Sequence, residues 1–400
     1  MSLNNPLLDF SNHPLFDAIQ PAHIAPALDQ LLPAADAALE QVTAADFPAE
    51  WKAIAAVLDV AISWAVKAAP AMAALAGALV PSRNNLPPAV VLPDKIVHNS
   101  GRTIPGQFAG LLGQRYDPWF LEVSPYHPLH YGAFPEYLFH HEKGRVSDEN
   151  LSFHSPELSL PQGLTLDRML DRVSLRDTIE RQSRALSDAA DDGQLDRYRE
   201  AAVSLLANTG VHDAFDLTHA DPRQLDRYGR NSFGWSLLMA KNLVQSGVRL
   251  VQVNLGNNET WDTHQAAWPN LKNFLLPPMD QAVSALIEDL DASGQLDETL
   301  IVMGGEFGRT PHSQGDDGRD HNNKGFSMWM AGGGVKGGMN YGMTDDYGYE
   351  AVLNKMHIHD WHATVLALLG LDHERLTFRY AGRDFRLTDV YGTVAKEIIA

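Results

Sequence analysis

The chain has no cysteine, and this absence removes several kinds of site at once. It excludes disulfide bridges, thiolate metal ligands and the sulfatases that convert a cysteine to formylglycine. Basic residues are also scarce, because 31 Lys and Arg stand against 50 Asp and Glu, giving a formal net charge of -19. This balance argues against nucleic acid or an anionic membrane surface as the main partner.

A secretory signal and a membrane span are the next features that the sequence lacks. The start, MSLNNPLLDFSNHPLFDAIQP, has no basic region followed by a long apolar run, so the sequence as written predicts a cytoplasmic protein. The Ala-rich segment 54–80 carries Asp59, Lys67 and Pro70. We interpret it as helical and not as a span, because alanine is only weakly apolar.

Strands and helices alternate through the second half of the chain. Apolar β-rich runs predict strands, and apolar residues at helical spacing predict helices. The predicted strands are 89–92, 248–255, 299–303 and 326–331, and the predicted helices fall within 164–244 and at 279–290 and 359–369. This alternation predicts an α/β fold with a doubly wound, mostly parallel sheet.

Two regions in the first half differ from that pattern. Pro26 and Pro48 begin two predicted helices, and an apolar stripe on the second makes them a helical hairpin that needs a partner surface. Between Pro81 and Pro161 the chain is rich in Pro, Gly, His and aromatic residues. That segment is interpreted either as binding loops or as an insertion that covers the sheet.

Three polar clusters follow or precede predicted strands. They are NETWDTH (258–264), GGEFGRT (304–310) and GRDH (318–321). Ligands bind at the carboxyl ends of the strands in open α/β sheets. The clusters supply five candidate ligands, namely Asp262, His264, Glu306, Asp320 and His321. Mixed carboxylates and imidazoles favour zinc, whereas carboxylates alone favour calcium or magnesium, so the pattern predicts a metal-dependent hydrolase.

Each candidate also has a plain structural interpretation. Asp262 and His264 are two residues apart and face the same way in an extended segment, but a surface turn with an Asp cap has the same sequence. Arg309 either holds an anionic substrate group or neutralises Glu306. Because such clusters occur beside several predicted strands, the metal-site interpretation is favoured over the structural one.

Two further patterns are interpreted as structural. AGGGVKGG (331–338) contains the spacing G-x-G-x-x-G, but the sequence after it does not predict the helix that a dinucleotide site requires. A glycine-rich turn is the better interpretation. His357, His359 and His362 are predicted to cap and pack a helix, with Asp360 near its N-cap and Gly370 just past its end.

Most of the chain resembles one bacterial family. The segments NNLPPAVVLP, NSGRTIPGQFAG, RYGRNSFGWSLL, VRLVQVNLGNNETWDTH and LLGLDHERLTFRYAGRDFRLTDVYG carry the resemblance. The family is the sulfatase-like domain of unknown function 1501, and the resemblance covers about residues 65–400. That family is similar to the alkaline phosphatase superfamily, whose members hydrolyse phosphate or sulfate esters at paired metal sites on a doubly wound sheet. Its members are often exported.

The resemblance implies roles for the candidate residues. Asp262, His264 and His321 are expected to share one metal ion, and Glu306 is expected to be the acidic ligand of a second. Arg309 and Asp320 are expected to bind the substrate, a small anionic ester. The expected ion is zinc, with calcium, magnesium or manganese as alternatives. The nucleophile is not identified.

The N-terminus resembles a different protein. NPLLDFSNHPLFDAIQPAHIAPAL and the following helices, to about Ala61, are similar to the start of oligopeptidase A, a zinc metallopeptidase. The H-E-x-x-H signature of that enzyme is absent. We therefore divide the chain into a helical hairpin at 1–65 and a sulfatase-like domain at 66–400, as in a fusion.

The fusion bears directly on activity. It replaces the region that supplies the first strand, one acidic ligand and the nucleophile in the superfamily, so esterase activity is expected to be weak or absent. The alternative is a non-catalytic, metal-binding or structural remnant. A metallopeptidase is the least favoured function.

Overall fold

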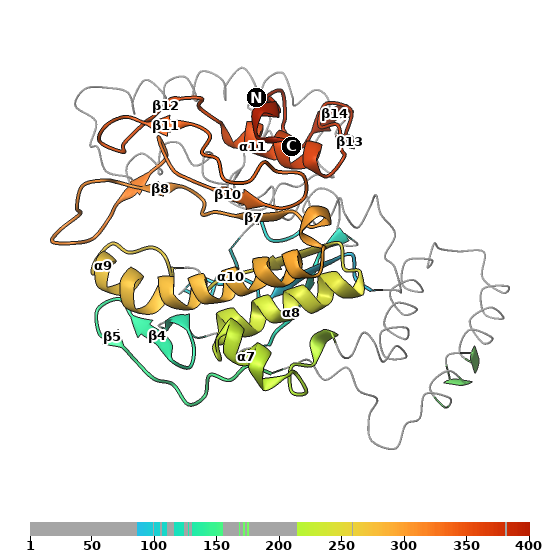
Figure 1. Cartoon of the computed structure of the whole chain (residues 1–400), viewed down its shortest axis with the longest axis vertical. Coiled ribbons are helices and arrows are strands. Elements are labelled where there is room, and N and C mark those ends of the chain that lie inside the picture. The colour runs from blue at the N-terminus through green and yellow to red at the C-terminus, as the bar shows by residue number, and fades with distance from the viewer. Residues whose placement is uncertain are drawn as a thin grey trace, which may run out of the picture. The chain divides into compact units, whose positions relative to one another are not determined.

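The structure is a computed structural model (Figure 1). It describes residues 86–98, 100–104, 106–109, 116–123, 127, 130–154, 168, 171–172, 174–175, 214–257, 259–380 and 382–400. The chain divides into two units, Met1–Trp64 and Ala65–Ala400, and every described residue belongs to the second. The predicted helical hairpin and most of the helical pattern between 164 and 213 lie outside the described residues.

A three-stranded parallel sheet supports the main core. β1 (Ala89–Leu92) lies between β2 (Trp119–Phe120) and β6 (Leu250–Val253). β1 is the predicted strand, is fully buried and consists of the apolar run AVVL. Because β1 and β6 are parallel, their carboxyl ends meet at one edge. There the Asn254 side chain donates to the carbonyl oxygen of Asp94 over 2.8 Å.

Three helices pack together beside this sheet (Figure 1). They are α7 (Pro222–Tyr228), α8 (Ser232–Ser246) and α10 (Leu276–Ala292). Asn231 caps α8 by accepting from two backbone N–H groups, and Gly247 ends it in the left-handed conformation. Their buried faces form one core with the sheet, including Val90, Leu92, Leu121, Phe215, Leu238, Leu243, Leu286 and Leu290. Each such side chain contributes roughly 1.5–3 kcal/mol by burial.

A small antiparallel sheet packs against the N-terminal end of α8. It consists of β3 (Tyr131–Ala133), β4 (Tyr137–His140) and β5 (Gly144–Arg145). Phe139 from β4 packs with Phe233 at the start of α8 and with Leu275 just before α10. This second core includes Tyr131 of β3 and also Leu255 and Trp261 from the loop that leaves β6, and polar side chains beside both are discussed below.

The C-terminal part contains short antiparallel pairs and one helix. The pairs are β7 (Ile301–Met303) with β10 (Trp329–Ala331), β8 (Gly308–Arg309) with β9 (His321–Asn322), β11 (Met343–Thr344) with β12 (Ala351–Leu353), and β13 (Thr377–Tyr380) with β14 (Arg383–Arg386). The helix is α11 (Ile358–Leu368). β7 and β10 lie within the segments predicted as strands.

The fold class agrees with the sequence only in its coarse form. Helices and strands are mixed and one sheet is parallel, but the described strands do not form a doubly wound sheet. β7 and β10 pair antiparallel because the chain between them, 304–328, forms the β8–β9 pair and loops. A parallel pair would require a crossover connection there, which is usually a helix.

The glycine-rich segment after β10 is a turn, as predicted. Gly332, Gly333 and Gly334 all have positive φ, and residues 332–350 contain no helix. The turn is held by the C-terminal residues, because Val335 forms a β-bridge with Ile399. This arrangement is incompatible with a dinucleotide-binding turn.

Within the described residues, none of the helices combines the length and the apolar character needed to cross a bilayer.

Candidate metal centre

Three of the predicted ligands meet at one point. The Asp262 Oδ1 atom lies 3.0 Å from Nε2 of His264 and 3.0 Å from Nε2 of His321. The two Nε2 atoms lie 3.2 Å apart. Two imidazole nitrogens and one carboxylate oxygen therefore form a nearly equilateral triangle.

Local structure places these side chains. Asp262 and His264 lie in a turn after β6, where the Asp262 N–H donates to the Glu259 carbonyl and the Trp261 indole donates to the Leu255 carbonyl over 2.7 Å. His321 lies on β9, directly opposite Arg309 of β8. The site thus combines a loop at the carboxyl end of a parallel strand with a short antiparallel ladder, and not the ends of neighbouring strands in one sheet.

A hydrogen bond sets the tautomer of His264. Its Nδ1 atom lies 2.6 Å from the side-chain oxygen Oε1 of Gln314. Since that oxygen only accepts, Nδ1 donates to it, and Nε2 is the ring nitrogen that faces Asp262 and His321. Metal-binding histidines commonly donate their other ring N–H to an oxygen in this way.

The triangle fits a divalent ion. Zinc bonds of 2.0–2.1 Å in tetrahedral geometry place neighbouring ligand atoms roughly 3.3 Å apart. The three observed separations of 3.0 to 3.2 Å are close to that edge. A lone pair of His264 facing a carboxylate oxygen is also repulsive unless a proton or a cation lies between them. The chemistry and the geometry of the donors therefore suit zinc or a similar ion.

Arg309 makes the contact with Glu306 that was its structural interpretation, and it also contacts Asp262, which was not predicted. Its guanidinium forms ion pairs with Asp262 and, over 3.4 Å, with Glu306. Burial alone would raise the pKa of the Asp262 carboxyl. The hydrogen bond from His321 and the charges of Arg309, His264 and His321 outweigh this effect and lower the pKa to about 2. The carboxylate is thus ionised at neutral pH, as a metal ligand must be.

Glu306 and Asp320 are not part of the triangle. Among the described residues, the group of converging donors contains neither of them. Glu306 turns toward Arg309 with 43% of its side chain exposed. Asp320 is exposed and accepts the backbone N–H of His321 over 2.7 Å, so it helps to orient the ladder residue beside it.

Two hydroxyls lie beside Arg102 in the sequence, on exposed Ser100 and half-buried Thr103. Ser100 Oγ is 2.8 Å from Nδ1 of His98, and Nε2 of His98 is 3.3 Å from a carboxylate oxygen of Glu259. Thr103 instead belongs to a backbone bridge with Val97. Of the two hydroxyls, Ser100 is the one with a base beside it, and the loop that carries Glu259 leads directly to the triangle.

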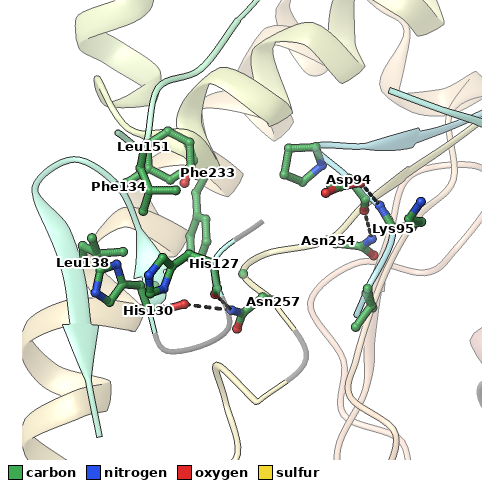
Figure 2. A pocket seen from close by; sticks show the side chains of 15 residues that line it. Asp94, Lys95, His127, His130, Phe134, Leu138, Leu151, Phe233, Asn254 and Asn257 are labelled. Carbon is green, nitrogen blue, oxygen red and sulfur yellow. Dashed lines mark hydrogen bonds between the residues drawn. The ribbon is translucent and has the colours of Figure 1, made fainter. Parts of the chain in front are cut away.

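A pocket opens at the carboxyl ends of β1 and β6 (Figure 2). Figure 2 shows His127 and His130 on one side and Asp94 and Lys95 on the other. Burial, with the nearby His127, lowers the pKa of His130. Sequence reasoning missed both histidines, although the segment HPLH within the His-rich region 81–161 was a usable signal.

The C-terminal histidines cap and pack α11, as predicted. His357 is its N-cap, with a reciprocal capping box to Asp360, and Gly370 follows the helix with a φ of +77°. His362 faces inward, and burial together with the nearby His359 lowers its pKa to about 4. These contacts account for the histidines without a ligand.

The pKa of His362 predicts an acid sensitivity. Its ordinary value is 6.5, so below pH 6.5 the unfolded chain binds a proton that the folded chain does not. Stability is fully present above pH 6.5 and is lost as pH falls toward 4. The expected loss from His362 is about 2 kcal/mol between pH 7 and pH 5. Urea unfolding of wild type and His362→Gln at both pH values should show a smaller loss in the variant; equal losses would contradict the prediction.

Gly318 predicts a steric constraint on the site. A Cβ atom there would lie 1.8 Å from the carbonyl oxygen of His264, so Gly318→Ala must displace the backbone of a ligand residue. We expect a loss of roughly 1–3 kcal/mol in stability together with weaker zinc binding. Gly337→Ala is the matched control, because a Cβ atom there meets nothing within 4 Å. Equal zinc affinities of the two variants by calorimetry would show that the constraint is unimportant.

The described part of the chain is thus a mixed α/β domain with a histidine–carboxylate cluster beside a parallel sheet. Residues 42–399 match the family described as protein of unknown function (DUF1501), so the chain belongs to that family. The match begins earlier than the boundary near residue 65 that the sequence suggested. No curated protein and no solved structure matches the chain.

Proposed function

We propose that this protein is a metal-dependent hydrolase of phosphate or sulfate esters, with Asp262, His264 and His321 as ligands of a divalent ion. The observation that carries the proposal is the triangle of donor atoms, with separations of 3.0 to 3.2 Å and the His264 tautomer set by Gln314. Zinc is the ion that this donor set suits best.

Each residue has a defined part in this function. An ion at the triangle would stabilise negative charge on the ester's non-bridging oxygens and favour deprotonation of water. With an ion present, Asp262 no longer needs Arg309 to balance its charge. The guanidinium is then available for an anionic group, which it can bind bidentately. Gln314 holds the His264 imidazole through Nδ1, and Asp320 accepts the backbone N–H of His321.

The assignment of the core's fold and of the substrate class follows the family's resemblance to the alkaline phosphatase superfamily. In this proposal the β2–β1–β6 sheet is part of an alkaline phosphatase-like core whose beginning is replaced by the N-terminal segment. The substrate is a small anionic ester. Because the fusion replaces the region that supplies one acidic ligand and the nucleophile in that superfamily, the second metal site is incomplete in this proposal, and turnover is expected to be slow.

A non-catalytic metal-binding role is the second candidate. It is favoured by the ion pair between Arg309 and Asp262, which already neutralises the carboxylate without any metal. In that case the protein binds zinc with measurable affinity and turns over no ester.

Metal content and turnover together test both candidates. Protein stripped with a chelator and reloaded with zinc, manganese or magnesium should hydrolyse an aryl phosphate or an aryl sulfate only when it is loaded. Arg309→Met should raise the KM, with Arg379→Met as the control, because Arg379 pairs with exposed Asp384. Ser100→Ala separates attack by serine from attack by water. Zinc binding without turnover of either ester would leave the non-catalytic role.

A further inference from the structure

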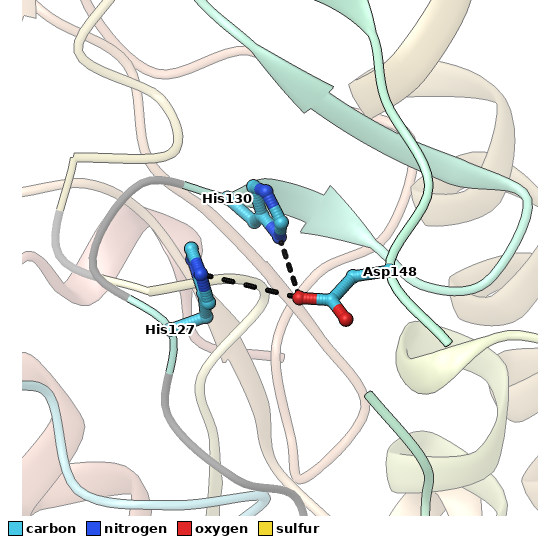
Figure 3. A group of neighbouring side chains, drawn as sticks. All are labelled: His127, His130 and Asp148. Atoms are coloured by element: carbon cyan, nitrogen blue, oxygen red, sulfur yellow. Dashed lines mark ion pairs between the residues drawn. The ribbon is translucent and has the colours of Figure 1, made fainter. Parts of the chain in front are cut away.

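A second group of donor atoms lies apart from the triangle in sequence (Figure 3). The Asp148 Oδ2 atom is 3.3 Å from Nδ1 of His130 and 3.9 Å from Nε2 of His127. The three donor atoms all lie within 4.8 Å of one another. Figure 3 shows both imidazoles pointing at the same carboxylate oxygen.

The carboxylate is held in this orientation from its other side. Its Oδ1 atom accepts the backbone N–H of Asn150 over 2.9 Å and the side-chain amide of Asn150 over 3.0 Å. Oδ2 is left to face the histidines. A carboxylate whose second oxygen is hydrogen-bonded in this way is typical of metal ligands.

The loop that carries both histidines is also held. The side-chain amide of Asn257 donates to the carbonyl oxygens of His127, over 3.1 Å, and His130, over 2.8 Å. Asn257 itself lies in the loop after β6, at the edge of the pocket (Figure 2). A single amide therefore fixes the backbone of both histidines relative to the parallel sheet.

The His130 ring indicates that the group lacks a central partner. Its Nδ1 atom is buried and, within the described structure, makes no hydrogen bond of acceptable geometry, although Asp148 is near. A buried ring nitrogen without a partner is costly. An ion between the two residues would satisfy it, and the separation of 3.3 Å equals roughly the edge of a tetrahedral zinc site.

We propose that His127, His130 and Asp148 form a second divalent-metal site, of zinc type, on the wall of the pocket. The donor set of two imidazoles and one carboxylate is the same as in the Asp262 triangle. Three protein ligands leave a position for water or for a small molecule in the pocket. The site does not depend on the proposed hydrolase activity.

Metal binding at this site requires one change in the rings. The two imidazoles are stacked, with centroids 3.8 Å apart and planes 14° apart. An ion must lie in the plane of each ring that binds it, so the rings turn out of the stack as both nitrogens converge. This rotation of the side chains leaves the backbone, and the contacts of Asn257, in place.

Cobalt titration of the full chain, purified without a polyhistidine tag, tests the proposal. The visible absorption of bound Co²⁺ and elemental analysis should give one ion more in wild type than in Asp148→Asn or His130→Gln. The loss of a ligand should weaken binding at this site by more than roughly 100-fold, because weaker outer contacts already change affinity by 10–100-fold. Asn150→Ala should give that smaller weakening while keeping all three ligands. His219→Gln is the control, since exposed His219 contacts Asp216 and Thr218 and belongs to neither group of converging donors.

The remaining variants separate this site from the triangle. His264→Ala should lose the triangle's ion and keep this one. A folded Asp148→Asn protein, and a folded Asn150→Ala protein, that bind as many ions as wild type with the same affinity would overturn the proposal. Absence of ester turnover in a protein that binds this ion would count against the proposed function and not against the site.

Discussion

His321→Ala is expected to abolish zinc binding at the triangle and, with it, any metal-dependent ester hydrolysis. The variant removes one of three donors, and it also removes the hydrogen bond that helps to ionise Asp262. The zinc affinity of the triangle should fall by more than roughly 100-fold. Calorimetric titration with zinc and turnover of an aryl phosphate, measured on the same preparations, give the two results.

The matched control is His312→Ala, because His312 is an exposed histidine on the same hairpin and lies outside the triangle. It should bind zinc and act like wild type. If His321→Ala and His312→Ala keep equal zinc affinity at the triangle, the assignment of His321 as a ligand is wrong. Metal-dependent turnover that survives only in the control would also show that the N-terminal replacement left a working enzyme.

The second large effect is expected in the helical layer, from Asp289→Asn. Asp289 on α10 accepts from Lys241 Nζ over 3.0 Å and from the Tyr228 hydroxyl over 3.0 Å, and it forms an ion pair with Arg227. Only 7% of the Lys241 side chain and 14% of that of Asp289 are exposed. Removing one partner leaves the buried ammonium unpaired, which costs about 3–5 kcal/mol.

Urea unfolding measures this loss as a shift of the transition midpoint at constant slope. Asp226→Asn is the control on the same layer, because its partner Arg230 is 53% exposed and an ion pair between exposed side chains contributes little to stability. A loss of similar size in both variants would mean that Lys241 finds another partner or is hydrated.

Local sequence patterns predicted the elements that depend on neighbouring residues. β1 was predicted with its exact bounds because AVVL is a short apolar run with prolines on both sides. α11 was predicted because Asp360 and Gly370 mark its two ends. The antiparallel pairing of β7 with β10 was not predictable, because it depends on what the intervening 304–328 segment does and not on either strand.

The residues of the candidate site were also predictable only where the signal was local. Asp262, His264 and His321 were predicted because each follows or precedes a predicted strand, which is a local signal. Their convergence depends on the β8–β9 ladder, which places His321 opposite Arg309 and was not predicted. Glu306 has the same signal, but its side chain turns toward Arg309 after two glycines. His127 was missed because its group needs Asp148, which lies beyond the β3–β4–β5 sheet in a segment without clear periodicity.

The β8–β9 ladder also limits which changes of length this region tolerates. In an antiparallel ladder, opposite residues share one face, so Arg309 and His321 reach the same site only in the present register. Losing or gaining one residue within either strand would turn one of them to the other face. An insertion at exposed Gly315 or Asp316, at the tip of the hairpin, would leave the register unchanged. Related chains that keep the site are therefore expected to differ in length at this tip and not in the ladder.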